Sequence, residues 1–105
     1  MNALRRWACV LPLAAAPLMA WAETHTLVME GMQIKPATLA VKRGDTVVWQ
    51  NKDLVPHTAT ATAAGVFDSG RIDPGKQWSW TVRGDGRIDY VCTYHPGMKA
   101  SLTVR

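Results

Sequence analysis

Short runs of alternating apolar and polar residues, separated by turns, dominate the chain from residue 24 onward. The clearest run is residues 77–82, whose period of two places Trp78, Trp80 and Val82 on one face. Turn sequences such as Asp73-Pro74-Gly75-Lys76 separate such runs, and no stretch has a convincing helical period. The pattern predicts an all-β fold, a Greek-key β-sandwich of about seven to eight strands. The expected strands cover residues 24–29, 38–42, 46–50, 57–62, 77–82, 87–92 and 100–104.

The N-terminal segment has a different composition. Arg5 and Arg6 precede an uncharged, largely apolar stretch, and Ala20-Trp21-Ala22 offers small residues where a signal peptidase reads them. The apolar stretch is shorter than the ~20 residues that a membrane-spanning helix needs. We therefore predict a cleaved signal peptide at residues 1–22, one domain at residues 23–105, and a periplasmic protein with no membrane span after processing. A retained N-terminal anchor and twin-arginine export stay open as alternatives.

Removal of this segment would change both the charge and the cysteine content. The net charge of +4 would fall to +2 with the loss of Arg5 and Arg6, and the remaining basic residues are scattered, which argues against nucleic-acid binding. Cys9 would also be lost, leaving Cys92 without a disulfide partner. A small exported domain without a disulfide needs another source of stability, such as a metal. Its free thiol needs burial or ligation.

The strongest chemical signal is Cys92-Thr93-Tyr94-His95-Pro96-Gly97-Met98, which holds a thiol, an imidazole and a thioether. A second imidazole, His57, lies upstream in Val55-Pro56-His57-Thr58. One thiolate, two imidazoles and a weak thioether form the ligand set of a type 1 (blue) copper centre. The spacing is too short for a helix to present all three side chains inward, so we expect a tight loop bent at residues 96–97. The predicted ligands of one copper ion are His57, Cys92, His95 and Met98.

Each predicted ligand has a plainer interpretation. His57 could be a surface-loop histidine, Cys92 a small buried apolar residue, and Met98 a side chain that fills a gap in the core. These three interpretations would all have to hold at once, whereas a copper site accounts for the residues together. We assign other residues of metal-binding type to the first strand, to packing or to the rim of the copper end: His25, Met29 and Met32.

The chain resembles the cupredoxins, with a ligand loop similar to that of the amicyanin and plastocyanin branch. The two-residue gaps on either side of His95 are similar to amicyanin, whereas plastocyanin has a longer second gap and azurin a longer first gap. Two features depart from the family: Thr58 stands where Asn is frequent, and the expected mature N-terminus lacks the leading segment of amicyanins. The resemblance rests on residues 41–51, 55–57, 67–70, 73–75 and 90–98.

The resemblance implies a monomeric electron carrier that is no enzyme. It would move single electrons between larger redox proteins, such as a dehydrogenase, a cytochrome or an oxidase, that dock transiently near His95. We expect the Thr58 N–H to donate to the Cys92 sulfur, because Pro96 has no N–H to offer. The candidate docking residues are Met32, Val55, Pro56, Tyr94, Pro96 and Gly97.

Two functions of other classes are the alternatives. A copper chaperone or scavenger would bind the ion and pass it on, but such a protein favours an open site. A cysteine hydrolase would use Cys92 as a nucleophile, which requires an accessible thiolate and an oxyanion hole. No helix precedes Cys92 in the expected fold, so the sequence disfavours the hydrolase.

Overall fold

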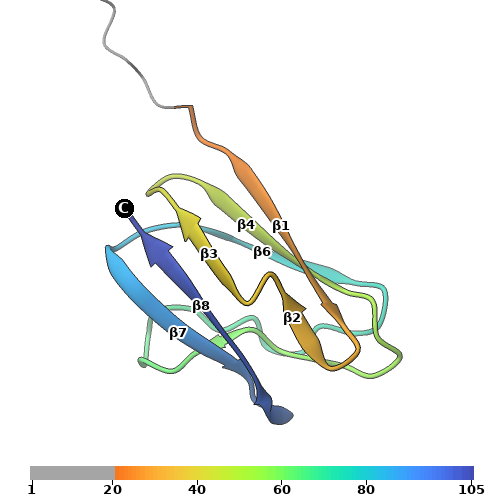
Figure 1. Ribbon diagram of the computed structural model, residues 1–105. Coiled ribbons are helices and arrows are strands. Elements are labelled where there is room, and N and C mark those ends of the chain that lie inside the picture. The colour runs from red at the N-terminus through yellow and green to blue at the C-terminus, as the bar shows by residue number, and fades with distance from the viewer. Residues whose placement is uncertain (1–20) are drawn as a thin grey trace, which may run out of the picture.

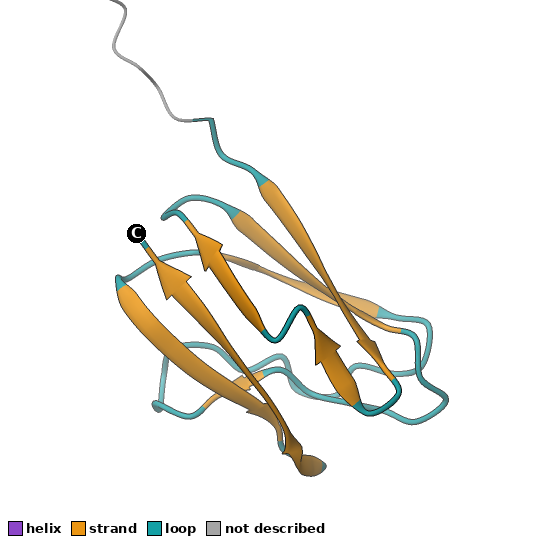
Figure 2. Ribbon diagram, in the orientation of Figure 1, coloured by secondary structure: helices purple, strands orange, loops and turns teal. Residues whose placement is uncertain are grey.

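The computed structural model describes residues 21–105, which form two β-sheets packed face to face (Figure 1). The first sheet has the order β2-β1-β4-β6, with β1 at Thr24–Glu30, β2 at Gln33–Lys35, β4 at Thr46–Asn51 and β6 at Gln77–Thr81. The second has the order β3-β8-β7-β5, with β3 at Thr38–Val41, β8 at His95–Val104, β7 at Gly86–Cys92 and β5 at Thr60–Ala61. The described residues contain no helix (Figure 2), so the predicted all-β sandwich is confirmed.

The strands differ from the sequence prediction by more than one residue at three places. The run predicted at 57–62 forms a strand only at Thr60–Ala61, and the last strand begins at His95 rather than at residue 100. Strand β2 was not predicted, because it has three residues and buries only Ile34, which gives no periodic signal. The shared face of the tryptophan-rich run is confirmed, with all three side chains packed on the core: Trp78, Trp80 and Val82.

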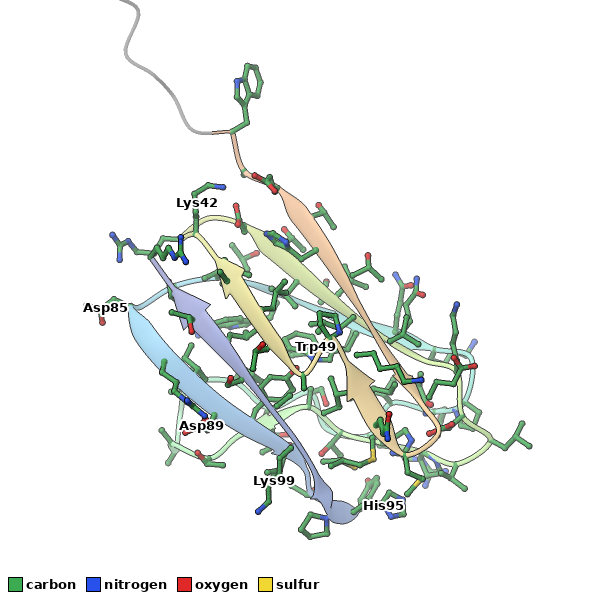
Figure 3. All side chains as sticks on the ribbon, in the orientation of Figure 1. Lys42, Trp49, Asp85, Asp89, His95 and Lys99 are labelled. Atoms are coloured by element: carbon green, nitrogen blue, oxygen red, sulfur yellow. The ribbon has the colours of Figure 1, made fainter. Side chains whose placement is uncertain are left out.

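An aromatic cluster centred on Trp49 fills the space between the sheets (Figure 3). The Trp49 ring lies 5.3 Å from Phe67 and 5.4 Å from Trp78, measured between centroids, and meets Tyr90 edge-on at 5.6 Å. Its Nε1–H donates to the Tyr90 hydroxyl at 3.2 Å. Burial raises the pKa of Tyr90 to about 12, outweighing the opposing effect of this bond. The cluster therefore joins the two sheets through both apolar area and a satisfied buried hydrogen bond.

A buried carboxylate, Asp45, organises one end of the sandwich. It accepts hydrogen bonds from the backbone N–H groups of Glu23 and Lys42, both at 2.9 Å, and lies 2.9 Å from Nε2 of His25. The two backbone bonds hold the pKa of Asp45 far below its usual range, against the effect of burial, and His25 adds to the lowering. His25 is thus a strand residue bonded to a carboxylate.

The lowered pKa of Asp45 predicts acid sensitivity. A carboxyl whose pKa falls on folding contributes stability above its unfolded pKa of about 3.9, and this contribution is lost as the pH falls through the folded value. We expect the free energy of unfolding to decrease below about pH 4 and Asp45→Asn to flatten that decrease. Urea unfolding at a series of pH values measures both. The exposed Asp85→Asn variant should behave as the wild type. If the free energy of unfolding of Asp45→Asn decreased below about pH 4 as steeply as that of the wild type, Asp45 would not be the source of the acid sensitivity.

Candidate metal centre

The fold brings two of the predicted ligands into direct contact. His57 lies in the loop after β4 and Cys92 ends β7, and both side chains are buried. Nδ1 of His57 lies 3.6 Å from Sγ of Cys92. The backbone of His57 is fixed by an antiparallel bridge to Ile72, with N···O distances of 3.0 and 2.7 Å. Residues far apart in sequence therefore meet at a defined position.

The turn between β7 and β8 carries the other two predicted ligands. Cys92 pairs with His95 across the two-residue turn 93–94, and the strand register slips immediately before this pair. Residues 96–98 are the extra residues of the resulting bulge. The bend predicted at residues 96–97 is therefore divided between a reversal at 93–94 and this bulge. Met98 is buried, whereas His95 is half-buried.

His95 lies at the tip of the molecule, beside the turn (Figure 3). Its ring meets that of His57 edge-on, with centroids 5.3 Å apart and an angle of 74° between the planes. Within residues 21–105, no three His, Cys, Asp or Glu side chains converge as a closed metal cage. His57 therefore contacts Cys92 on one side and the ring of His95 on the other.

Thr58 joins the two loops that carry the predicted ligands. Its N–H donates to the sulfur of Cys92 at 3.3 Å, as the sequence predicted. Its hydroxyl oxygen accepts the N–H of Thr93 at 2.9 Å and the hydroxyl of Thr60 at 3.0 Å. A threonine thus makes the cross-link itself, so the absence of the frequent Asn at this position leaves no gap.

Two polar residues that the sequence analysis did not single out support His57. The Asn51 amide donates to the carbonyl oxygens of Val55 at 2.8 Å and Ile72 at 3.0 Å, and its Oδ1 accepts the N–H of Asp53 at 2.9 Å. The carboxylate of Asp53 then lies 2.7 Å from Nε2 of His57. The signal that could have revealed them is an Asn two residues before an Asp, a spacing typical of an Asx turn.

Asp53 is ionised at neutral pH, and an ionised carboxylate can only accept hydrogen bonds. Nε2 of His57 must therefore carry a proton and donate it to Asp53. Burial would raise the pKa of Asp53, but hydrogen bonds from His57, Met32 and Gly31 outweigh this and lower it. A neutral imidazole with its proton on Nε2 has a lone pair on Nδ1. That lone pair faces Cys92.

The donor atoms fit a metal ion. The thiol of Cys92 can donate to Nδ1 of His57 across 3.6 Å. With metal–nitrogen and metal–sulfur bonds of about 2.0 and 2.3 Å, as for zinc, and an angle of roughly 110–120°, the two ligand atoms lie about 3.5–3.7 Å apart. A metal ion can therefore replace the proton without separating the pair. Thiolate, imidazole and thioether donors together suit copper.

The two-sheet fold and the predicted donor atoms both point to a cupredoxin. The sequence profile of the copper binding proteins of the plastocyanin/azurin family matches residues 23–105, and the chain belongs to that family. The cofactor expected from the sequence, one type 1 copper ion, is the cofactor of this family.

Among individual relatives, the chain is similar to amicyanins. The amicyanin of Paracoccus denitrificans is 32% identical over 77 residues, which cover 70% of this chain and 59% of the relative. The amicyanin of Paracoccus versutus is 27% identical over 97 residues, covering 89% and 72%. The matched region thus spans little more than half of the first of these relatives.

Solved structures give the same likeness. A mutant amicyanin in the Cu(I) state has a TM-score of 0.72 at 29% identity, covering 78% of this chain and 82% of that one. The purple cupredoxin from Nitrosopumilus maritimus has a TM-score of 0.71 at 22% identity, covering 77% and 99%, which shows a shared fold. In the part of the chain that the structure describes, no helix is long and apolar enough to cross a membrane.

The role of the Thr58 hydroxyl can be tested by substitution. Thr58→Val keeps the backbone N–H that bonds the Cys92 sulfur but removes the acceptor of the Thr93 N–H. We expect a loss of about 1–3 kcal/mol in the free energy of unfolding, because that N–H loses its partner. Denaturant titration measures the loss, and Thr58→Ser, which retains the hydroxyl, should recover most of it. Equal stability of the Val variant and the wild type would refute the cross-link.

Proposed function

We propose that the protein is a periplasmic electron carrier whose copper ion is held by His57, Cys92, His95 and Met98. The observation that carries the proposal is the buried contact between Nδ1 of His57 and the Cys92 sulfur, which also accepts the N–H of Thr58. Copper supplies a one-electron couple, and a site fixed for both oxidation states lowers the reorganisation needed for transfer.

The surrounding residues would control how that couple behaves. The Thr58 N–H withdraws electron density from the Cys92 sulfur and holds it in place. The buried Met98 offers a weak thioether donor, which suits a long axial bond. The two-residue turn 93–94 and the Thr58 cross-link restrain the loop, so the site changes little between oxidation states.

The surface beside His95 suits transient docking of a redox partner. Large exposed apolar side chains occur in the loop before His57 and in the β1–β2 and β7–β8 turns: Met32, Leu54, Val55 and Tyr94. Leu54, which is 95% exposed, was not among the docking residues expected from the sequence. Such a surface can exclude water around the half-buried His95 ring while staying small enough for rapid release. The protein would act on its own as a monomer and not as an enzyme.

The burial of the Cys92 sulfur favours an electron carrier over a copper chaperone or a cysteine hydrolase. A chaperone that hands on its ion needs ligands that a partner can reach, and Cys92 is fully buried and Met98 is 4% exposed. A hydrolase needs a thiolate that a substrate can approach. The observed site favours movement of electrons, which need only the exposed edge of His95, over movement of ions or groups.

Export would be accompanied by cleavage of the signal peptide before Glu23. Residues 1–20 lie outside the described part of the chain, but the N–H of Glu23 donates to the buried Asp45 carboxylate at 2.9 Å. Cleavage there would replace this amide with an ammonium group facing the same carboxylate, which strengthens the bond. This contact supports the proposed boundary between a signal peptide at 1–22 and a domain at 23–105.

The thiolate assignment predicts the optical spectrum. The copper(II) protein should show an intense visible band from charge transfer out of the Cys92 sulfur, with a narrow copper hyperfine splitting. In Cys92→Ser the band should be lost almost completely, because an alkoxide or hydroxyl cannot replace the soft thiolate. Absorption and electron paramagnetic resonance spectra measure this. Retention of the blue band in the serine variant would refute the assignment.

The proposed role of Met98 as a weak axial ligand predicts a change in the reduction potential. Met98→Leu removes a weak donor but leaves the three strong ligands, so the intense band should persist. Loss of this donor destabilises bound copper(II) more than bound copper(I), and the reduction potential should therefore rise. Voltammetry measures the shift, with Met29→Leu, a buried methionine of β1, as the control. Copper loss as complete as in Cys92→Ser would mean that Met98 is a primary ligand.

A further inference from the structure

One carboxylate joins the metal centre to a strained turn on the neighbouring hairpin. Oδ1 of Asp53 accepts the N–H of Gly31 at 2.7 Å, and Oδ2 accepts the N–H of Met32 at 3.1 Å. Oδ2 also lies 2.7 Å from Nε2 of His57. The His57 side chain is completely buried and that of Asp53 is 15% exposed, so the pair is largely shielded from solvent.

The turn held by Asp53 has an unfavourable backbone. Glu30 pairs with Gln33, so Gly31 and Met32 form a two-residue turn, with φ angles of 64° and 60°. A turn with two positive φ angles normally carries Asn or Gly, and Met32 is the only non-glycine residue with positive φ among those the structure describes. A backbone conformation of this kind persists only where the surrounding structure holds it in place. The Asp53 carboxylate holds the turn by accepting hydrogen bonds from both N–H groups.

We propose that Asp53 is a positioning residue of the metal centre, which orients the His57 ring through Nε2 and locks the β1–β2 turn against it. The proposal rests on the proposed role of His57 as a copper ligand. With its proton held on Nε2, His57 must present the Nδ1 lone pair to the metal. Rotation of the ring would break a buried hydrogen bond to a charged group.

The charge of Asp53 also affects the metal. A carboxylate bonded to the far nitrogen of a ligating imidazole makes that imidazole a stronger donor, and loss of such a partner typically lowers metal affinity about 10–100-fold. The stronger donor stabilises copper(II) more than copper(I), because the charge of copper(II) is greater. Asp53 thus lowers the reduction potential of the site.

The chain contains a matched control at the opposite end of the sandwich. Asp45 also accepts two backbone N–H groups and lies 2.9 Å from Nε2 of a histidine, His25. Figure 3 shows Lys42, whose N–H is one of these donors, at the end away from His95. The Asp45→Asn variant therefore removes the same charge and the same type of contact without touching the copper site.

The first measurement needs no substitution. Nitrogen-15 NMR of the metal-free wild type should show the His57 proton on Nε2 with Nδ1 unprotonated. An unprotonated Nε2, with the ring proton on Nδ1 alone, would overturn the proposal, because Asp53 would then not set the ring.

The second measurement compares variants in the copper-loaded full domain. In Asp53→Asn the single amide oxygen cannot serve all three donors, so we expect copper(II) affinity to fall about 10–100-fold, the potential to rise, and the amides of Gly31 and Met32 to exchange faster. Asp53→Glu keeps the charge and should recover most of the potential. Asp45→Asn should lose stability with no change in potential.

The outcomes distinguish this proposal from the function on which it rests. An unchanged potential in Asp53→Asn, or an equal shift in Asp45→Asn, would overturn the positioning role while the wild type remained blue. A wild type that binds copper without the intense band would refute the proposed function, and the positioning role with it.

Discussion

The bonds from Thr58 to the Cys92-Thr93 segment are the interaction on which the site depends. His57 and Cys92 come from different loops, separated by 35 positions, and neither loop has an apolar core of its own. The aromatic cluster around Trp49 fixes the two sheets, but it does not by itself fix the loops at their end. Thr58 does so with its N–H on the sulfur and its hydroxyl on the N–H of Thr93. Loop geometry at the centre thus depends on a residue adjacent to a predicted ligand, together with the bridge between His57 and Ile72.

Polar groups near this end are costly to bury, and the structure shows how the cost is offset. Asn51 uses both ends of its amide, on two carbonyl oxygens and on the N–H of Asp53. Asp53 in turn accepts three N–H donors. In a region of low dielectric such a network is rigid only when every member is satisfied. The result is a histidine whose ring orientation is determined before any metal binds.

The sequence predicted the sandwich because strands such as β6 alternate cleanly and bury one face. It also singled out His57, Cys92 and His95, because thiol and imidazole groups are rare in the chain, and the structure brings these three side chains together. The role of Met98 as a fourth ligand stays a prediction. It did not reveal β2, which is too short for a period, or the bulge after His95, which depends on pairing with β7. It did not single out Asn51 or Asp53. Their role depends on a turn near residue 31 that contacts them only in the folded chain.

The two histidine–carboxylate pairs show why residue type alone does not define a site. His25 with Asp45 and His57 with Asp53 share the same contact through Nε2, at 2.9 and 2.7 Å. They differ in what the other ring nitrogen meets. Nδ1 of His57 faces Cys92, which is the one cysteine among the described residues, whereas the His25 side chain is 18% exposed near the chain's start. One pair therefore anchors a strand, and we propose that the other orients a donor atom toward a metal. The difference arises from the position of one sulfur atom, which the pairing of β7 with β8 determines.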